Sequence, residues 1–338
     1  MIPVSVETPD DIADQVDQML EQGDRVAALR YAMKAIEPLL QAPSDALRFE
    51  IRDKIFRKFK KLQYQRSDFE IVDYCGFEIS EKMPLFRGPK PSDEILAKGD
   101  YFCVMGAAQT YGRLVVKPWP NRLSKKIGLP VLNLGRGGVG PQYFENDRLL
   151  KLASGARFVV LQAMSGRSVG CSEYPGGRIV FDGNEAVNRL TILRNIWDKD
   201  REKAKELVLR WNESYFKLYE RLRDLIGRPT ILLWVSCRAP DDWSPETLLT
   251  SEDMDTGDFP QLVGRELYNK VAEIFPANLE YINSDNVEFP RSRVTGQRCP
   301  HLGSNDTKDK VQYYLSSESH RQVALELVPL AKELYQAA

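Results

Sequence analysis

The sequence of 338 residues predicts an α/β fold, a three-layer α/β/α sandwich with a mainly parallel five-stranded sheet, preceded by an N-terminal helical appendage. Two observations lead to this prediction. Five short apolar segments without polar alternation occur after residue 100, and such segments are typical of parallel strands that are buried on both faces. Amphipathic segments with helical spacing separate them, and this regular alternation is typical of a doubly wound sheet.

The N-terminal part of the chain has the apolar spacing of helices. Apolar residues recur three and four positions apart through residues 8–62, and the last helical pattern there carries a basic stripe between Lys54 and Lys61. We interpret the stripe as a solvated charged face, whereas a basic amphipathic helix can also bind anionic lipid or phosphate. We therefore expect a helical segment at 1–65, which packs on the main domain, on a protein partner or in a homo-oligomer, and an α/β domain at 66–338.

Strands and helices are expected to alternate in the main domain. After a strand-like stretch at 69–79, the apolar segments that would form the sheet are FCVM at 102–105, VLNL at 131–134, FVVLQA at 158–163, ILLWVS at 231–236 and LEYIN at 279–283. The helices expected between and after them cover residues 121–127, 143–152, 199–225, 261–274 and 317–335. Because helices separate the strands, neighbouring strands should run parallel, with helices on both faces of the sheet.

The composition excludes several classes of protein. Lys and Arg number 47 and Asp and Glu 48, a net charge of −1, so no overall field attracts the chain to nucleic acid or to an anionic membrane. The five cysteines include no Cys-x-x-Cys pair, which argues against a disulfide framework or a zinc site and favours the cytoplasm. The start MIPVSVETPDD is acidic and no apolar stretch approaches 18 residues, so we expect neither secretion nor a transmembrane segment. No phosphate-binding loop or metal-ligand cluster predicts a cofactor or a metal.

Three loops follow three of the predicted strands, where open α/β sheets bind their ligands. The loops are GAAQTYG at 106–112, NLGRGGVGP at 133–141 and QAMSGRS at 162–168. Arg136, Arg167 and Arg238 each follow a predicted strand and would converge on the same edge of the sheet. Since guanidinium groups bind carboxylate, phosphate or sulfate in bidentate geometry, this edge is a predicted anion site.

In order and spacing, these loops resemble the sequence blocks of the SGNH or GDSL hydrolase superfamily, from about Tyr101 to Ala338. In that superfamily the first block reads Gly-Asp-Ser-x-Thr-x-Gly, the second supplies a glycine, the third an asparagine and the last an Asp-x-x-His pair. The resemblance implies a flavodoxin-like strand order and ester cleavage by a serine that a histidine activates, with backbone, glycine and asparagine donors at the oxyanion. The words GAAQT, GRGGxGP, MSGR and YYxSxExH also resemble an uncharacterised, divergent set of SGNH-like proteins found near sulfotransferases and glycan-modifying enzymes.

The first block departs from the superfamily pattern at the attacking group. When the block is aligned on Gly106 and Gly112, Thr110 matches, but Ala107 takes the place of the aspartate and Ala108 that of the serine. The usual serine nucleophile is therefore missing.

The second and third blocks retain groups that could bind an anion. Gly135 or Gly137 can present a backbone N–H, and Arg136 adds a charge that an acyl site does not need. In the third block the sequence SGRS places Arg167 and Ser168 near the position of the usual asparagine.

The final block allows two alignments. One places His320 on the catalytic histidine, with Ser317 in place of the aspartate that would orient it. The other, which we favour because Ala324 then falls correctly, places Tyr314 on the catalytic histidine and Val311 on its aspartate. On the second alignment the whole triad is missing.

Two classes of function remain open. A non-hydrolytic descendant would bind an anionic small molecule or glycan, and the residues expected to bind it are Gly106, Ala108, Gln109, Thr110, Arg136, Gly137, Arg167 and Arg238. An active esterase, or an acyl- or sulfo-group transferase, would instead use a relocated hydroxyl and a histidine, and its catalytic candidates are Ser165, Ser168 and His320. Neither class is expected to need a cofactor.

Overall fold

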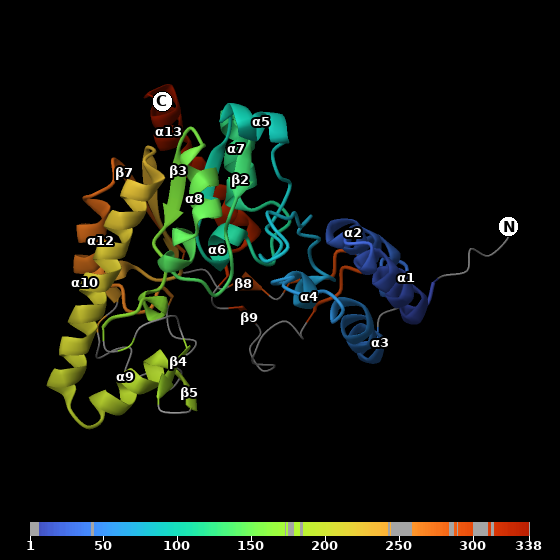
Figure 1. Ribbon diagram of the computed structural model, residues 1–338, viewed down its shortest axis with the longest axis horizontal. Coiled ribbons are helices and arrows are strands. Elements are labelled where there is room, and N and C mark those ends of the chain that lie inside the picture. The colour runs from blue at the N-terminus through green and yellow to red at the C-terminus, as the bar shows by residue number, and fades with distance from the viewer. Residues whose placement is uncertain are drawn as a thin grey trace. The chain divides into compact units, whose positions relative to one another are not determined.

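A computed structural model describes residues 7–41, 44–172, 174, 179–182, 185–242, 244, 259–283, 287–288, 290–299, 310–311 and 314–337. The chain forms two compact units, whose elements are labelled in Figure 1. The first unit comprises Met1–Lys90, Arg113–Val116 and Asn286–Tyr314, and the second comprises Pro91–Gly112, Lys117–Asp285 and Leu315–Ala338. A division of the chain into domains at residue 65 stays a prediction.

The described part of the first unit is mainly helical. Its elements are α1 (Pro9–Glu21), α2 (Arg25–Ala35), the 3-10 helix η1 (Leu39–Gln41), α3 (Asp45–Ile51), the π-helical turn η2 (Arg52–Phe56), α4 (Gln65–Asp68) and the paired strands β8 (Val287–Glu288) and β9 (Lys310–Val311). Helix α1 begins with a capping box, in which the Thr8 hydroxyl accepts from the Asp11 N–H and the Asp11 carboxylate accepts from the Thr8 N–H.

The apolar faces of these helices form the core of the first unit. Ile12 and Val16 of α1 are buried there together with Phe56 of η2. The basic stripe lies outside this core, where Lys54 pairs with Asp10 and Lys58 with Asp17. The stripe is thus engaged with acids of its own unit.

A buried ion pair holds Arg113 in the first unit. Arg113 Nε donates to Asp68 Oδ2 at 2.9 Å, and the Asp68 side chain is fully buried. The same carboxylate accepts from the Tyr74 hydroxyl at 2.7 Å. The guanidinium carbon lies 4.2 Å and 4.7 Å from the ring centroids of Tyr64 and Tyr314. Charge, hydrogen bonds and aromatic contacts therefore all fix the position of this arginine.

The strand-like stretch at 69–79 does not form a strand. A side chain bonds its backbone instead, because Gln65 donates to the Val72 carbonyl at 2.9 Å and accepts from the Tyr74 N–H at 2.8 Å. Within this stretch only Phe77 pairs in β fashion, through an isolated antiparallel bridge. Bonding to a local side chain here takes the place of a β-ladder.

The second unit contains the predicted five-stranded parallel sheet. Its strands are β1 (Phe102–Met105), β2 (Val131–Asn133), β3 (Val159–Gln162), β6 (Thr230–Ser236) and β7 (Ala277–Ile282). Their order is β2-β1-β3-β6-β7 and every pairing is parallel, so the order is the flavodoxin-like one. In the register of the sheet, Cys103 lies opposite Leu132 and Val159. The predicted α/β class and the parallel sheet are confirmed.

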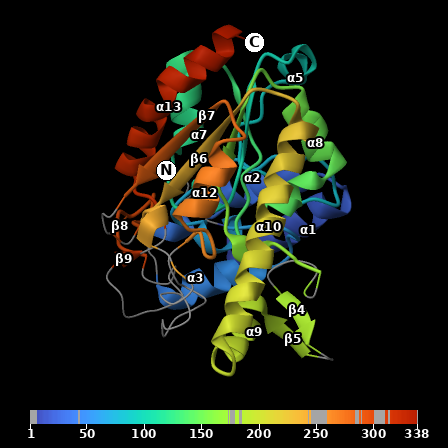
Figure 2. The ribbon, with the colours of Figure 1, turned by 90° about the vertical axis from the view of Figure 1, so that its left-hand side faces the viewer.

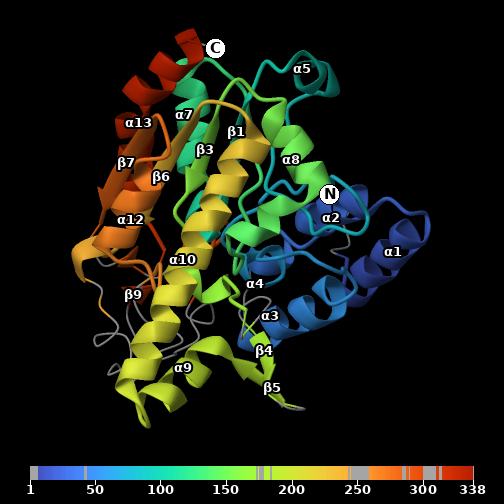
Figure 3. The ribbon, with the colours of Figure 1, turned by 60° about the vertical axis from the view of Figure 1, so that its left-hand side comes forward.

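Helices cover both faces of this sheet. The remaining elements of the unit are α5 (Asp93–Lys98), α6 (Ala108–Tyr111), α7 (Trp119–Ile127), η3 (Pro141–Glu145), α8 (Asp147–Ser154), η4 (Gly166–Ser168), β4 (Ile179–Asp182), β5 (Glu185–Asn188), α9 (Arg189–Trp197), α10 (Arg201–Ile226), η5 (Pro240–Asp242), α12 (Arg265–Ala272) and α13 (Ser317–Ala337). Helices α7 and α13 lie on one face and α8, α10 and α12 on the other (Figures 2 and 3). Trp119 of α7 and Leu327 of α13 pack against Val104 and Val160 of the sheet. No helix in the described residues is long and apolar enough to cross a lipid bilayer.

Replacing Asp68 by alanine is expected to lower the free energy of unfolding by about 3–5 kcal/mol, because Arg113 would remain buried without its partner charge. Arg113→Ala should cost a similar amount, and the double variant should cost less than the sum of the two. Urea unfolding followed by circular dichroism measures these differences.

Arg57→Ala is the matched control for this experiment. Arg57 pairs with Asp53 four residues away, and its side chain is 57% exposed, so its loss should cost no more than about 0.5 kcal/mol. Equal costs for Arg57→Ala and Arg113→Ala would contradict the importance of the buried pair.

Candidate functional site

The turn after β1 holds two alanines where the resemblance implies an aspartate and a serine. Ala107 precedes α6 and Ala108 opens it, and both are buried. Gly112 ends the helix with a φ of 76°, a left-handed conformation that favours glycine. Neither alanine can attack an acyl group or transfer a proton, so the position where the resemblance implies a serine holds no nucleophile.

Gln162, the last residue of β3, fills the polar space at this turn. Its Oε1 accepts from the Ala107 N–H at 2.9 Å and from the Thr110 hydroxyl at 2.7 Å, and its Nε2 donates to Gln109 Oε1 at 3.2 Å. A side chain at Gly106 would not fit, because its Cβ would lie 2.6 Å from Gln162 Oε1. The turn is therefore a closed, buried hydrogen-bond network, which we call the Gln162 network.

The glycine loop after β2 closes this network from a second side. Asn133 Nδ2 donates to the Thr110 carbonyl at 3.0 Å, and its Oδ1 accepts from the Gly135 N–H at 2.8 Å. The Arg136 N–H donates to the Gly106 carbonyl at 2.9 Å. These two backbone N–H groups, which could otherwise bind an oxyanion, are already bonded within the protein.

Two tyrosines of α10 hold the chain that leaves β3. The Tyr219 hydroxyl donates to the Gln162 carbonyl at 2.9 Å and accepts from the Met164 N–H at 2.8 Å, and the Tyr215 hydroxyl donates to the Met164 carbonyl at 2.7 Å. Burial raises the pKa of both phenols well above the usual range. Both therefore stay protonated near neutral pH and fix the start of the third loop.

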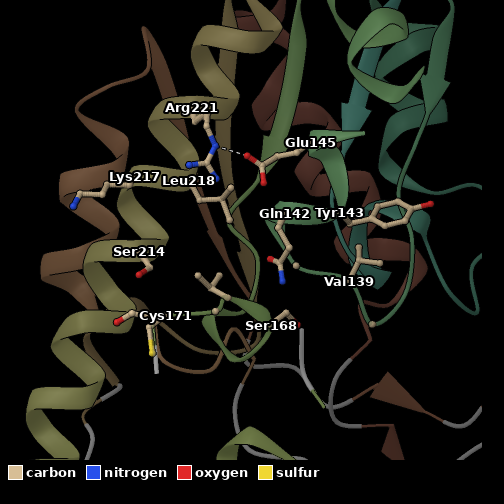
Figure 4. A pocket seen from close by; sticks show the side chains of 15 residues that line it. Val139, Gln142, Tyr143, Glu145, Ser168, Cys171, Ser214, Lys217, Leu218 and Arg221 are labelled. Carbon is tan, nitrogen blue, oxygen red and sulfur yellow. Dashed lines mark hydrogen bonds and ion pairs between the residues drawn. The ribbon is translucent and has the colours of Figure 1, made fainter. Parts of the chain in front are cut away.

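A cavity of about 630 Å³ lies between the loops after β2 and β3 and helix α10 (Figure 4). This volume is typical of small-molecule sites. Its described lining comes from three parts of the chain. These are the loop after β2 with η3 (Gly138, Val139, Gly140, Gln142, Tyr143, Glu145), the loop after β3 (Ser168, Val169, Gly170, Cys171, Ser172) and α10 (Ser214, Lys217, Leu218, Arg221). The two loops meet closely, since a Cβ on Gly140 would lie 2.5 Å from Ser168 Cβ.

Two cations and one carboxylate line the cavity. Arg221 Nε donates to Glu145 Oε1 (Figure 4), and Lys217 pairs with Glu213 at 2.6 Å. The Lys217 and Arg221 side chains are 63% and 56% exposed, and Figure 4 shows the Lys217 ammonium directed away from Gln142 and Ser168. In the described part of the chain, no group of three His, Cys, Asp or Glu side chains could hold a metal ion.

Two buried polar atoms of the lining make no hydrogen bond with any described residue. They are Gln142 Oε1 and Tyr143 Oη. A buried polar atom without a partner costs about 1–3 kcal/mol, so a ligand that bonds to it gains more than one that meets a satisfied group. The Arg136 guanidinium carbon lies 4.6 Å from the Tyr143 ring centroid, which places Arg136 against the cavity wall.

The three residues predicted to be catalytic have different surroundings. Ser168 is buried and lines the cavity, and its hydroxyl makes no hydrogen bond within the described residues. The Ser165 hydroxyl donates to Gln261 Oε1 at 2.7 Å. His320 Nδ1 accepts from the Trp119 N–H at 3.1 Å, so this nitrogen carries no proton and caps α7. Of these three, only Ser168 belongs to the described lining of the cavity.

The predicted arginines do not line the cavity among its described residues. Arg238 is buried, and its guanidinium donates to three backbone carbonyls. Arg136 and Gly137 are half-buried, and so is Arg167, which directly precedes Ser168. The ligand-binding role of these residues stays a prediction.

The sequence does not predict three residues of this region, Gln162, Lys217 and Arg221. Lys217 and Arg221 lie four residues apart on a charged helix, a pattern that usually indicates only a solvated face. Their place in a site depends on the packing of α10 beside loops far away in the sequence. Gln162 does carry a signal, since it is a polar residue at the end of an otherwise apolar strand.

Comparisons with known proteins give one family match and distant structural neighbours. Residues 62–174 match the model of a family described as a domain of unknown function (DUF6473). No curated protein matches the chain.

Two solved structures are similar to the chain. A lipase from a goat rumen metagenome is 11% identical, with a TM-score of 0.35, over 67% of this chain and 95% of that one. A carbohydrate esterase family 2 enzyme with a carbohydrate-binding domain, from Corynascus thermopiles (Myceliophthora fergusii), is 9% identical, with a TM-score of 0.39, over 75% of this chain and 70% of that one. At these TM-scores neither likeness bears on the function of this chain.

Gln162→Leu is expected to lower the free energy of unfolding by about 1–3 kcal/mol, because the buried Ala107 N–H and Thr110 hydroxyl would lose their acceptor. Gln142→Leu is the matched control, and it should be neutral or slightly stabilising because it removes an acceptor that has no partner among the described residues. Chemical unfolding compares the two variants, and a larger cost for Gln142→Leu would contradict this description of the turn.

Proposed function

We propose that this chain is a divergent SGNH-hydrolase-like protein with a degenerate catalytic turn, which binds its ligand without cleaving it. The ligand is anionic, a carboxylate, phosphate, sulfate or acidic glycan. It occupies the cavity lined by Ser168, Lys217 and Arg221.

The Gln162 network is the main support for the proposal that the chain does not hydrolyse its ligand. A serine hydrolase needs a nucleophile, a base within hydrogen-bond reach and free N–H donors for the oxyanion. The turn after β1 has alanines in place of the nucleophile, and the N–H of Ala107 is bonded to Gln162. The Nδ1 of His320 is bonded to Trp119. The nucleophile is thus missing, and the Ala107 N–H and the His320 Nδ1 are already bonded.

Positive charge at the cavity supports an anionic ligand. Lys217 and Arg221 lie one helical turn apart in the described lining, and each pairs with one carboxylate, Lys217 with Glu213 and Arg221 with Glu145, so an anion would bind there by replacing a carboxylate of the protein. Because the Lys217 and Arg221 side chains are both more than half exposed, each ion pair with a ligand would contribute about 0.2–1 kcal/mol. Arg136 and Arg167, next to lining residues, would add to the positive potential.

An active esterase or acyltransferase with a relocated nucleophile is the alternative. Ser168 favours it, because its hydroxyl lines the cavity and makes no hydrogen bond within the described residues. A serine also needs a base, and the described lining contains no histidine. The two other possible bases of the lining, Lys217 and Glu145, pair with Glu213 and Arg221, and for this reason we prefer the binding function.

Addition of sulfate or phosphate is expected to raise the Tm of the wild-type protein by about 4 °C at a hundredfold excess over Kd. The double variant Lys217→Ala/Arg221→Ala should lose most of this shift, because it removes both cations of the lining. Arg223→Ala is the matched control, since Arg223 lies on the same helix, pairs with Asp224 and is not part of the described lining.

Two outcomes would contradict the proposed function. A shift that is unchanged in the double variant would remove the cavity as the binding site. Labelling of Ser168 by a fluorophosphonate probe, with hydrolysis of p-nitrophenyl acetate that Ser168→Ala abolishes, would establish the active esterase instead.

A further inference from the structure

We infer that the cavity takes a polyhydroxylated acid, such as a uronic acid or a sugar phosphate, and that the acid group of this ligand displaces Glu145 from Arg221. The inference rests on the proposed function. It narrows the class of anion and assigns Glu145 the role of a competitor within the protein.

Hydroxyl and amide groups of the lining require a ligand that both donates and accepts hydrogen bonds. Gln142 Oε1 is an acceptor without a partner among the described residues, and Figure 4 shows the Gln142 side chain directed toward Ser168. The Ser168 hydroxyl makes no hydrogen bond in the described part of the chain. The Ser214 hydroxyl donates to the Arg210 carbonyl at 3.0 Å, so its oxygen remains available as an acceptor.

Bare oxyanions do not satisfy this set of groups. A sulfate ion or a carboxylate has only acceptor atoms, so it cannot donate to Gln142 Oε1 or to the Ser214 oxygen. A sugar hydroxyl can do both, because it is a donor and an acceptor. Val139, Val169 and Leu218 add apolar wall to the same cavity, which suits the C–H face of a sugar ring. The lining thus favours a hydroxyl-rich ligand over a simple anion.

The Arg221–Glu145 pair is the place where the acid group of such a ligand would bind. Both residues line the cavity, and the pair is visible in Figure 4. Arg221 is 56% and Glu145 28% exposed, and ion pairs in such surroundings contribute little net free energy. A ligand carboxylate or phosphate can therefore replace Glu145 on the guanidinium at little cost, with a bidentate geometry that a guanidinium favours.

Glu145 lowers the affinity of the cavity for the acidic ligand. While it pairs with Arg221 it occupies the cation, and once displaced its charge repels the bound acid. A neutral sugar does not need the guanidinium, so Glu145 should not affect its binding. The effect of Glu145 should consequently depend on the charge of the ligand, which a purely structural residue would not show.

Calorimetric titration of the full-length protein with glucuronate, glucose 6-phosphate, glucose and acetate tests the inference. Glucuronate or glucose 6-phosphate should bind at least about tenfold more tightly than glucose and acetate, and the stronger of the two identifies the acid group. Glu145→Gln should tighten binding of that acid by about two- to fivefold, the range expected for an exposed ion pair, and leave glucose unchanged. Arg221→Met should lower the affinity for that acid at least to the affinity for glucose.

Glu206→Gln is the matched control, because Glu206 is an exposed acid of α10, paired with Arg210 and outside the described lining. It should leave all four affinities unchanged. Equal binding of acetate and glucuronate, or weaker acid binding in Glu145→Gln, would overturn the inference. The proposed function would still be supported if an anion raised the Tm of the wild-type protein and Lys217→Ala/Arg221→Ala lost that rise. No binding of any acid, together with no rise in Tm, would overturn both.

Discussion

The side chain of Gln162 is the constraint on which the rest of the site depends. It ends β3, the central strand of the sheet, and its amide bonds the Ala107 N–H, the Thr110 hydroxyl and the Gln109 side chain. A buried amide with several partners is costly to disturb, because each broken bond leaves a polar group without water. The turn after β1, where an esterase would carry its nucleophile, is thus linked to β3 by these hydrogen bonds. A reaction at this edge of the sheet would have to use groups outside the turn.

The cavity beside α10 supplies such groups, and they differ from those of an acyl-transfer site. Lys217, Arg221 and Glu145 are charged residues of its lining, while Gln142 supplies a buried polar atom without a partner in the described chain and Ser168 supplies a hydroxyl. Cations and half-satisfied polar groups are suited to holding an anion with hydroxyl groups. A wound α/β sheet can in this way carry a ligand pocket at the carboxyl ends of its strands, and the side chains there decide its chemistry.

The sequence predicts the sheet far better than the site. Each of the five apolar segments after residue 100 becomes a strand. In β1, β2, β3 and β6 every residue is buried, as a continuous apolar run indicates, whereas β7 is a partly exposed edge strand. The strand predicted at 69–79 does not form, because the side chain of Gln65, which precedes the stretch, bonds the backbone of Val72 and Tyr74. Ser168 is predicted as a candidate and lies in the cavity, whereas Lys217 and Arg221 read as a solvated helix face until α10 is placed beside the loops. Short-range patterns report burial, but they do not report which distant elements meet.

Amide hydrogen exchange, measured with and without a saturating acidic sugar, can show whether the ligand binds in the cavity while the turn after β1 stays closed. The account predicts slow exchange at 106–111 in both states and new protection of 138–145 when the ligand binds. New protection at 106–111 with none at 138–145 would contradict it.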